Sequence, residues 1–278
     1  MNSIQLIALD NFPSIKPYDD LVEIIIKSLN SNNISIDDMD VIVVAQKIIS
    51  KAENRFLDLD KIQVLDEAKK LANDLNKDPG LIQAIINESN KILSTDKGVV
   101  IVEHNLGFIN INAGIDQSNI SQSNNIALLL PEDPSKSAKN LGEGLSKALN
   151  KDISIIISDS MTRPYRFGVI NFALASHNLP SLIDLKGKED MYGNKLKGTE
   201  VAIADELASA SGLLMGQSNE MKPVILVKGF NKKSYKPNDA LSRFFPALSL
   251  NCVILFNHPT LAVQLRYQDK TLCSLTDD

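Results

Sequence analysis

Asp152-Ile-Ser-Ile-Ile-Ile-Ser-Asp-Ser-Met-Thr-Arg-Pro-Tyr-Arg-Phe-Gly168 is the stretch that decides the fold. Its apolar run from Ile153 to Ile157 has the length of a buried strand and is too short for an ordinary helix. The residues after this run are polar, and Pro164 and Gly168 prevent one regular element from continuing through them. The stretch therefore predicts a buried strand followed by a polar segment that carries Asp159, Ser160, Arg163 and Arg166.

This polar segment has side chains suited to a metal ion and a phosphate group. A carboxylate binds a hard cation through oxygen, and the planar guanidinium of arginine matches two phosphate oxygens. A polar turn with a surface ion pair would explain the same residues, because such pairs are common. The segment by itself leaves both interpretations open.

Length and composition limit the class of protein. The chain has 278 residues, a formal net charge of −5 and 44% hydrophobic residues, which suits one large domain or two modest ones. It has no apolar run of the roughly 18 residues that a membrane span needs, and its first residues do not resemble a signal peptide. The Cys and His spacing argues against a zinc site, and no basic run indicates a nucleic-acid surface. We expect a cytoplasmic protein that binds small molecules, with neither nucleic acid nor membrane as partner.

The rest of the chain alternates between amphipathic and apolar segments. Helices are predicted over about 19–29, 63–76, 79–86, 134–148 and 199–215, and strands over 40–45, 99–103, 107–112, 125–130, 223–229 and 252–256. No GxxxxGK[ST] motif occurs, which excludes the P-loop class of nucleotide enzymes. The pair Gly142 and Gly144 lacks the third glycine of a dinucleotide fingerprint and lies inside a predicted helix, so we reject that motif.

A second polar stretch follows an apolar segment, at Asn112-Ala-Gly-Ile-Asp-Gln-Ser-Asn119. Asp116 offers carboxylate oxygens, and Gly114 lets the backbone approach a ligand closely. An Asx-turn would account for this composition too. Lys47 and Lys51 are four residues apart and can point the same way, as a solvated basic face or as phosphate contacts. Together the two aspartates and the basic residues can hold divalent cations beside nucleotide phosphates.

The order of these motifs resembles the coenzyme F420-0:L-glutamate ligase family, the γ-glutamyl ligases. Each motif alone is weak, whereas the ordered set is specific. The resemblance runs from about residue 4 to residue 229 and leaves out 230–278. The matching segments are Phe12–Leu21, Asp40–Glu53, Asn112–Asn119, Leu129–Pro134, Ser158–Ser160 with Arg163–Arg166, and Thr199–Gly216.

The resemblance implies a GTP-dependent ligase that needs Mg²⁺ or Mn²⁺, as two ions, with K⁺ as a further candidate. In such enzymes the nucleotide phosphorylates a substrate carboxylate, and the amino group of L-glutamate attacks the acyl phosphate to form an amide. The substrates would be GTP, L-glutamate and an anionic carboxylate acceptor, coenzyme F420-0. The alternatives are the same chemistry on another small acid, for example a folate-like one, or a catalytically silent regulator that binds nucleotide and metal.

The same resemblance implies an α+β fold, with a two-domain subunit of mixed sheets flanked by helices and an intertwined homodimer. A nucleotide-binding α/β domain is expected over 1–95 plus 195–278. An inserted domain for metal, substrate and dimerisation is expected over 96–194.

Carried over residue by residue, the resemblance also predicts the site. Asp116 and Asp159 would hold one metal ion, and Ser160 and Gln217 would help to hold a second. Arg163 and Arg166 would be catalytic, because the crowded phosphate and carboxylate charges need nearby cations. The residues expected to contact the nucleotide are Phe12, Pro13, Ser14, Ile15, Gln46, Lys47, Lys51, Asn119, Met215, Gly216 and Ser218.

This sequence departs from the family pattern in three places. Asn54 stands where glycine is usual, and Ser160 replaces the commoner threonine while keeping a hydroxyl. Met161-Thr162 stands where a small or glycine-containing pair is usual. Because Thr162 adds a Cβ where glycine would leave the backbone freer, this departure bears on the acceptor more than on the nucleotide or the metals.

Overall fold

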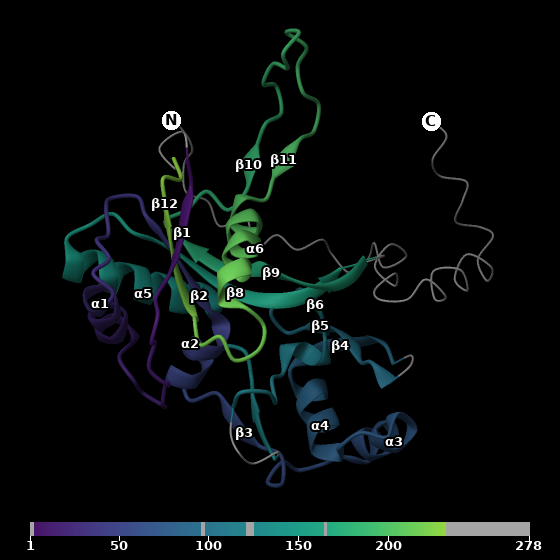
Figure 1. Ribbon diagram of the computed structural model, residues 1–278. Helices are drawn as coiled ribbons and strands as arrows, with labels where there is room; N and C mark the ends of the chain where they lie inside the picture. Colours follow the sequence, from purple (N-terminus) through teal and green to yellow (C-terminus); the bar gives the residue numbers. More distant parts are fainter. Residues whose placement is uncertain (1–2, 96–97, 121–124, 164–165, 232–278) are drawn as a thin grey trace.

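A five-stranded sheet organises the protein (Figure 1). The computed structural model describes residues 3–95, 98–120, 125–163 and 166–231. The strand expected over 252–256 lies outside these ranges, and so do Cys252 and Cys273. Strands β2 and β8 pair in parallel, and the other neighbours are antiparallel. In spatial order the strands are β1 (Gln5–Ala8), β12 (Val224–Lys228), β2 (Val41–Ala45), β8 (Ser154–Arg163) and β9 (Arg166–His177).

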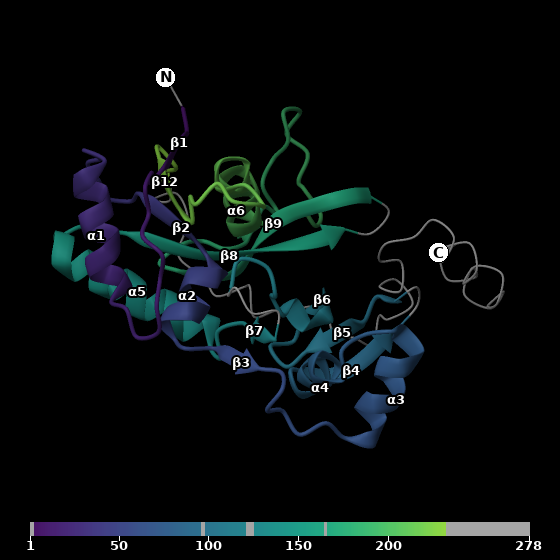
Figure 2. The ribbon, with the colours of Figure 1, turned by 60° about the horizontal axis from the view of Figure 1, so that its bottom comes forward.

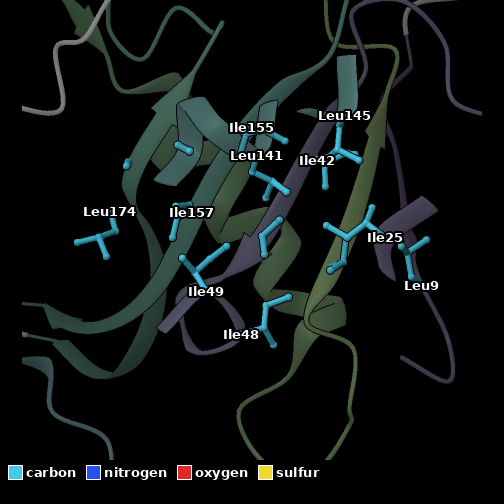
Figure 3. Close-up of a cluster of buried hydrophobic side chains, with 14 of the residues drawn as sticks. Leu9, Ile25, Ile42, Ile48, Ile49, Leu141, Leu145, Ile155, Ile157 and Leu174 are labelled. Carbon is cyan, nitrogen blue, oxygen red and sulfur yellow. The ribbon is translucent and has the colours of Figure 1, made fainter. Parts of the chain in front are cut away.

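Helices cover both faces of this sheet (Figures 1 and 2). Helices α1 (Leu21–Ser31), α2 (Gln46–Ala52) and α5 (Pro134–Leu149) pack on one face, and α6 (Ile203–Met215) packs on the other. Successive side chains of a strand point to opposite faces. Accordingly Ile42 and Val44 of β2 join the core under α1 and α5 (Figure 3), whereas Val41 and Val43 join the core under α6. A strand buried on both faces is apolar throughout, which is why β2 and β8 stand out in the sequence.

A second core lies beside the main sheet, at the lower right of Figure 1. Strands β4, β5 and β6 form a three-stranded antiparallel sheet, and β3 pairs with β7. The elements are β3 (Phe56–Asp58), α3 (Asp66–Leu75), α4 (Pro79–Asn87), β4 (Ser89–Ser94), β5 (Ile101–His104), β6 (Ile109–Ile111), the 3-10 turn η2 (Asn112–Gly114) and β7 (Ile126–Leu128). The short strands β10 (Ile183–Asp184) and β11 (Glu200–Val201) form the base of a projecting arm.

The mixed α+β architecture agrees with the sequence-based expectation. The expected split into 1–95 plus 195–278 and an inserted 96–194 stays a prediction. Within the described ranges, β8 and β9 from the middle of the chain share one sheet with β1, β2 and β12. None of the helices in those ranges combines the length and the apolar character that crossing a membrane requires.

The central segment differs from the sequence-based expectation. Residues Asp159 to Arg163 continue strand β8 instead of leaving it for an irregular segment. The reason is the partner strand β9, which the sequence pattern did not reveal: Ser160 pairs with Asn171, and Thr162 pairs with Val169. Cross-strand pairing thus holds polar residues in extended geometry. Helix α6 also begins later than expected, at Ile203, because the residues before it form β11.

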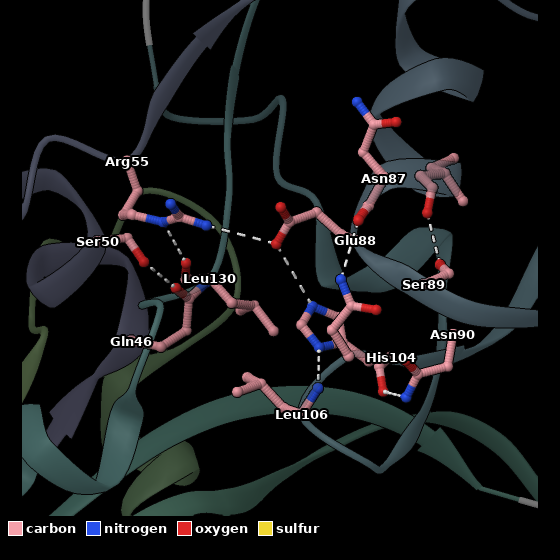
Figure 4. A network of polar contacts seen from close by, with 12 residues as sticks. Gln46, Ser50, Arg55, Asn87, Glu88, Ser89, Asn90, His104, Leu106 and Leu130 are labelled. Atoms are coloured by element: carbon pink, nitrogen blue, oxygen red, sulfur yellow. Dashed lines mark hydrogen bonds and ion pairs between the residues drawn. The ribbon is translucent and has the colours of Figure 1, made fainter.

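A polar network joins the two cores (Figure 4). Arg55, between α2 and β3, donates through Nε to the Leu130 carbonyl at 2.8 Å and lies 3.4 Å from the Glu88 carboxylate. His104 of β5 is only 2% exposed, with Nε2 3.8 Å from Glu88 Oε2. Its Nδ1 accepts a hydrogen bond from the Leu106 backbone at 2.9 Å. Burial, and then the charge of Arg55, lower the pKa of His104 to about 4, so the ring is neutral at physiological pH.

The buried His104 predicts an acid-sensitive fold. The pKa of His104 is lower in the folded chain than in the unfolded one. Its contribution to folding stability is therefore complete above about pH 6.5 and is lost as pH falls to about 4. The full loss amounts to about 3 kcal/mol. We expect the unfolding free energy of wild type to fall over this range relative to His104→Asn, which retains an acceptor for Leu106. Urea unfolding at several pH values measures this difference.

Burial raises the pKa of Glu88, so its titration changes the unfolding free energy in the opposite direction. Comparing wild type with His104→Asn at each pH removes this effect. His177→Asn controls for the loss of a histidine elsewhere. Parallel curves for wild type and His104→Asn between pH 4 and 6.5 would contradict the prediction.

Candidate active site

A cavity of about 420 Å³ opens where strand β2 ends, beside the middle of strand β8. This volume lies in the range of small-molecule sites. The cavity is lined by residues 12–15 after β1, the end of β2 with α2, the loop after η2, residues 158–160 of β8, Asn171 of β9, and residues 215–223 at and after the end of α6. The cavity brings together all of the nucleotide residues predicted from the sequence and all four predicted metal residues.

The pairing of the strands explains why residues distant in sequence meet here. Ala45 of β2 lies opposite Ser158 of the parallel strand β8, so Gln46 and Asp159 follow at the same edge of the sheet. Asp116 is held at this edge by an isolated antiparallel bridge to Leu128. The Asp116 N–H donates to the Leu128 carbonyl at 3.0 Å, and the Asp116 carbonyl accepts from the Leu128 N–H at 2.8 Å. The sequence placed Asp159 just after a strand, whereas it lies inside β8.

Gln46 acts on both carboxylates. Its Nε2 donates to Asp116 Oδ2 at 2.7 Å, and its amide also acts to lower the pKa of Asp159. Its Oε1 accepts from the Ser50 hydroxyl at 2.9 Å. Gln46 is buried and begins helix α2, so the amide is fixed from both ends. It therefore acts as a rigid link between β2 and the Asp116 loop.

The two aspartates repel each other in a poorly solvated place. Burial, and then the charge of Asp116, raise the pKa of Asp159 to about 7. Burial also raises the pKa of Asp116, although Lys47 and Gln46 act in the opposite direction. Two carboxylates that disfavour each other's charge form a shared site with an excess of negative charge. A bound cation would remove that excess.

The donor set fits a hard divalent cation. Mg²⁺ takes one or two carboxylates and completes its octahedron with phosphate oxygens and water. Asp116 and Asp159 supply those carboxylates, while Ser160 and Gln217 add oxygens at the same cavity. Among the described residues there is no group of three or more His, Cys, Asp or Glu side chains that would build a complete protein cage. The residues therefore suit an ion that shares its ligands with a bound phosphate.

Two lysines supply positive charge beside the carboxylates. Lys47 Nζ lies 3.4 Å from Asp116 Oδ1 and donates to the Ser118 carbonyl at 3.2 Å. Lys51, one turn further along α2, donates to the Asn119 carbonyl at 2.8 Å. Burial, and then the charge of Lys47, lower the pKa of Lys51. The pair lies on the cavity side of α2, which favours the phosphate-contact interpretation over a solvated face.

The loop after η2 also binds the segment after α6. Asn119 has a left-handed backbone conformation, with φ of 58°, and its Nδ2 donates to the Ser218 carbonyl at 2.7 Å. Gly216 ends α6 as expected, with φ of 71°. These contacts close one side of the cavity.

Arg163 and Arg166 are not among the described residues that line the cavity. Both lie at the far end of the β8–β9 hairpin, where Arg163 donates to the Phe167 carbonyl at 3.4 Å and Arg166 is exposed. Thr162 has ordinary extended geometry in the ladder, so a glycine is not required there. Asn54 has φ of 55°, a conformation that asparagine tolerates in place of glycine.

The cavity is also lined by residues that the sequence pattern does not indicate, namely Ser158, Asn171 and residues 219–223. Asn171 had a visible signal, because it is a lone amide in the apolar run Val169-Ile-Asn-Phe-Ala-Leu-Ala175. A buried amide in such a strand must have hydrogen-bond partners. The loop 219–223 follows no recognisable pattern.

Comparison with known proteins agrees with this geometry. Residues 10–229 match the family model described as F420-0:Gamma-glutamyl ligase. The chain is 38% identical over 227 residues to the coenzyme F420:L-glutamate ligase of Methanothermobacter thermautotrophicus, covering 82% of this chain and 89% of that protein. The Methanocaldococcus jannaschii protein of the same name is 41% identical, over 70% of this chain and 78% of its own length. The Archaeoglobus fulgidus protein of that name is 34% identical, over 82% and 88%. The chain belongs to the F420-0:γ-glutamyl ligase family.

Proposed function

We propose that this protein uses GTP and a divalent metal, Mg²⁺ or Mn²⁺, to join the amino group of L-glutamate to the carboxylate of coenzyme F420-0. The observation that carries the proposal is the cavity, in which two mutually repelling aspartates face two lysines. The identity to ligases named for coenzyme F420 and L-glutamate supports the choice of substrates.

The reaction passes through an acyl phosphate. The acceptor carboxylate attacks the terminal phosphorus of GTP, and GDP leaves. The amino group of L-glutamate then attacks the acyl carbon, inorganic phosphate leaves, and the nitrogen loses a proton as the amide forms. The divalent ions supply Lewis acidity that neutralises charge on the transferred phosphoryl group, with K⁺ as a further candidate ion.

The chain's own residues hold and orient the reactants. Asp116 and Asp159 would bind one ion, and Ser160 and Gln217 would contribute to a second. Lys47 and Lys51 would contact the phosphates, and the 12–15 segment with the 215–218 segment would enclose the nucleotide. Charge neutralisation matters because carboxylate and triphosphate repel each other on approach. Arg163 and Arg166 stay predictions for the acceptor side.

Product formation tests the proposal. Purified protein is incubated with GTP, Mn²⁺, L-glutamate and F420-0, and products are identified by mass spectrometry. We expect GDP, phosphate and a glutamylated F420-0, each requiring all four components. D-Glutamate in place of L-glutamate serves as a matched control. GTP turnover that ignores the acceptor, or a glutamylated product formed without nucleotide, would contradict the proposal.

We also propose that the protein forms a homodimer. Large apolar side chains are exposed on its projecting parts: Met191 and Tyr192 on the arm are 87% and 81% exposed, and Phe167 on the β8–β9 hairpin is 92% exposed. A partner subunit that covered these side chains would remove apolar surface from water. Sedimentation equilibrium would give the dimer mass, and a monomer at all concentrations would contradict this proposal.

A further inference from the structure

A buried amide on strand β9 lies beneath the cavity. Asn171 is 6% exposed and is one of the lining residues. Its Nδ2 donates to the Ser158 hydroxyl at 3.1 Å, and its Oδ1 accepts from Gln217 Nε2 at 2.7 Å. The side chain therefore connects strand β8 with the loop after α6. Both ends of the amide have partners, which fixes which way it points.

This contact decides the orientation of Gln217. A glutamine amide carries a donor end and an acceptor end, and its terminal torsion is broad, so an exposed glutamine can present either. Gln217 is exposed. With Nε2 bonded to Asn171, the carbonyl oxygen Oε1 is the end of the amide that remains for a ligand in the cavity, which Gln217 lines. A hard cation binds that oxygen and not the NH₂ group.

Asn171 is in turn held by helix α6. A Cβ built on Gly212 would lie 2.8 Å from Asn171 Cγ and 2.9 Å from its Oδ1. Glycine inside a helix costs about 1 kcal/mol relative to alanine, yet here it makes room for the asparagine side chain. The Ser209 hydroxyl donates to the Asn171 carbonyl at 2.6 Å, and Asp205 accepts from the Ala173 N–H at 2.9 Å. Strand β9 lies at the edge of the sheet, so these contacts fix it on its open side.

We propose that Asn171 is a positioning residue that turns the amide of Gln217 so that its oxygen faces a divalent cation. The inference rests on the proposed function, in which Gln217 contributes to the second metal ion. Residues that orient a metal ligand typically change metal affinity 10–100-fold when replaced. Asn171 touches neither substrate nor metal in this role and acts through Gln217 alone.

Mn²⁺ binding measured by electron paramagnetic resonance tests this without turnover. The full-length protein is titrated with Mn²⁺ in the presence of a non-hydrolysable GTP analogue, without glutamate or acceptor. We expect Asn171→Leu to weaken the binding of the more weakly held Mn²⁺ ion about tenfold, and we expect the same of Gln217→Leu. The double variant should bind Mn²⁺ no more weakly than either single variant, since both substitutions remove the same ligand oxygen, Gln217 Oε1.

A conservative variant separates positioning from packing. Asn171→Asp keeps an oxygen that accepts from Gln217 Nε2, so Mn²⁺ affinity should stay within about threefold of wild type, the scatter that context gives such contacts. If the added charge attracted Mn²⁺ directly, Asn171→Asp would also strengthen binding in the Gln217→Leu background. We expect no such rescue there. In steady-state assays, Asn171→Leu should raise the metal KM more than it lowers kcat at saturating metal.

Two results overturn the inference. One is a folded Asn171→Leu with unchanged Mn²⁺ binding, and the other is additive losses in the double variant. If Asn171→Leu does not fold, Gly212→Ala replaces it, because the added methyl group displaces the Asn171 side chain. Normal Mn²⁺ binding by a folded Gly212→Ala would then overturn the inference as well.

The failure of this inference can be told apart from failure of the proposed function. Wild type that binds no Mn²⁺ with the nucleotide analogue would overturn both the inference and the metal requirement. Wild type that forms the glutamylated product with Mn²⁺, while a folded Asn171→Leu binds both ions normally and Gln217→Leu does not, would overturn the inference alone.

Discussion

Asp159→Asn is expected to lower the turnover number at least about 10³-fold, because the metal it would hold contributes several kcal/mol to transition-state stabilisation. Asparagine keeps the size of the side chain and one oxygen but removes the negative charge. Asp116→Asn should have a comparable effect, since the two carboxylates act on one site. Steady-state GTP turnover with saturating L-glutamate and acceptor measures the loss.

The same variant should not weaken the fold. The pKa of Asp159 is raised from its ordinary value of 3.8 to about 7 in the folded protein. Ionisation of Asp159 therefore opposes folding, increasingly between about pH 4 and pH 7 and fully above that range. At pH 8 without metal, Asp159→Asn should unfold at the same temperature as wild type or at a higher one. Calorimetry in a chelating buffer measures this.

Asp40→Asn provides the matched control. Asp40 precedes β2, at the end of that strand opposite the cavity, and its buried carboxylate lies 3.2 Å from Lys228 Nζ. Removing its charge leaves Lys228 with a weaker partner, so stability should drop while turnover stays within about twofold, as for other sites remote from the chemistry. If Asp159→Asn behaved like Asp40→Asn, losing stability with normal turnover, Asp159 would be a structural residue.

The sequence singled out residues that the structure brings to one cavity, whereas it missed some of the elements that position them. Asp116 and Asp159 could be singled out because each follows an apolar run, and the apolar runs themselves follow from burial on both faces of the sheet. Their meeting depends on the register of β2 with β8, where Ala45 lies opposite Ser158. Register arises from long-range packing, which local periodicity does not encode.

Strand β9 shows the opposite case. The sequence pattern does not predict a strand over residues 166–177, and it therefore does not single out Asn171 either. The β8–β9 ladder also shifts register between Ile157 and Ser158, where Leu174 is the extra residue. Such a bulge bends a strand and redirects its side chains, so counting alternate residues from the sequence assigns faces wrongly beyond it. The arginines at the hairpin end illustrate a different limit, because the family motif gave their identity without their distance from the cavity.

Lys51→Met is expected to weaken GTP binding about 10–100-fold. A charge-assisted hydrogen bond to phosphate contributes about 1.5–3 kcal/mol, and methionine keeps the apolar stem while removing the ammonium group. Lys51 already lies at the cavity, where burial and the charge of Lys47 lower its pKa. The negative charge of a bound phosphate would offset both the burial of the Lys51 ammonium group and its repulsion by Lys47. Fluorescence titration with a labelled GTP in Mg²⁺, without glutamate or acceptor, measures the dissociation constant.

Two comparisons make the Lys51 result specific. Lys69→Met removes an exposed lysine of α3 that pairs with Asp66, remote from the cavity, and should leave GTP binding unchanged. Lys47→Met should change the binding of both GTP and Mn²⁺, because Lys47 lies beside Asp116 as well as beside the proposed phosphate position. Removing Lys47 takes away a cation that competes with metal for the Asp116 carboxylate, so Mn²⁺ binding without nucleotide should strengthen. Lys51→Met should leave that binding near wild type, since Lys51 bonds to the Asn119 carbonyl instead. A Lys51→Met protein with normal GTP affinity would assign the phosphates to another part of the cavity.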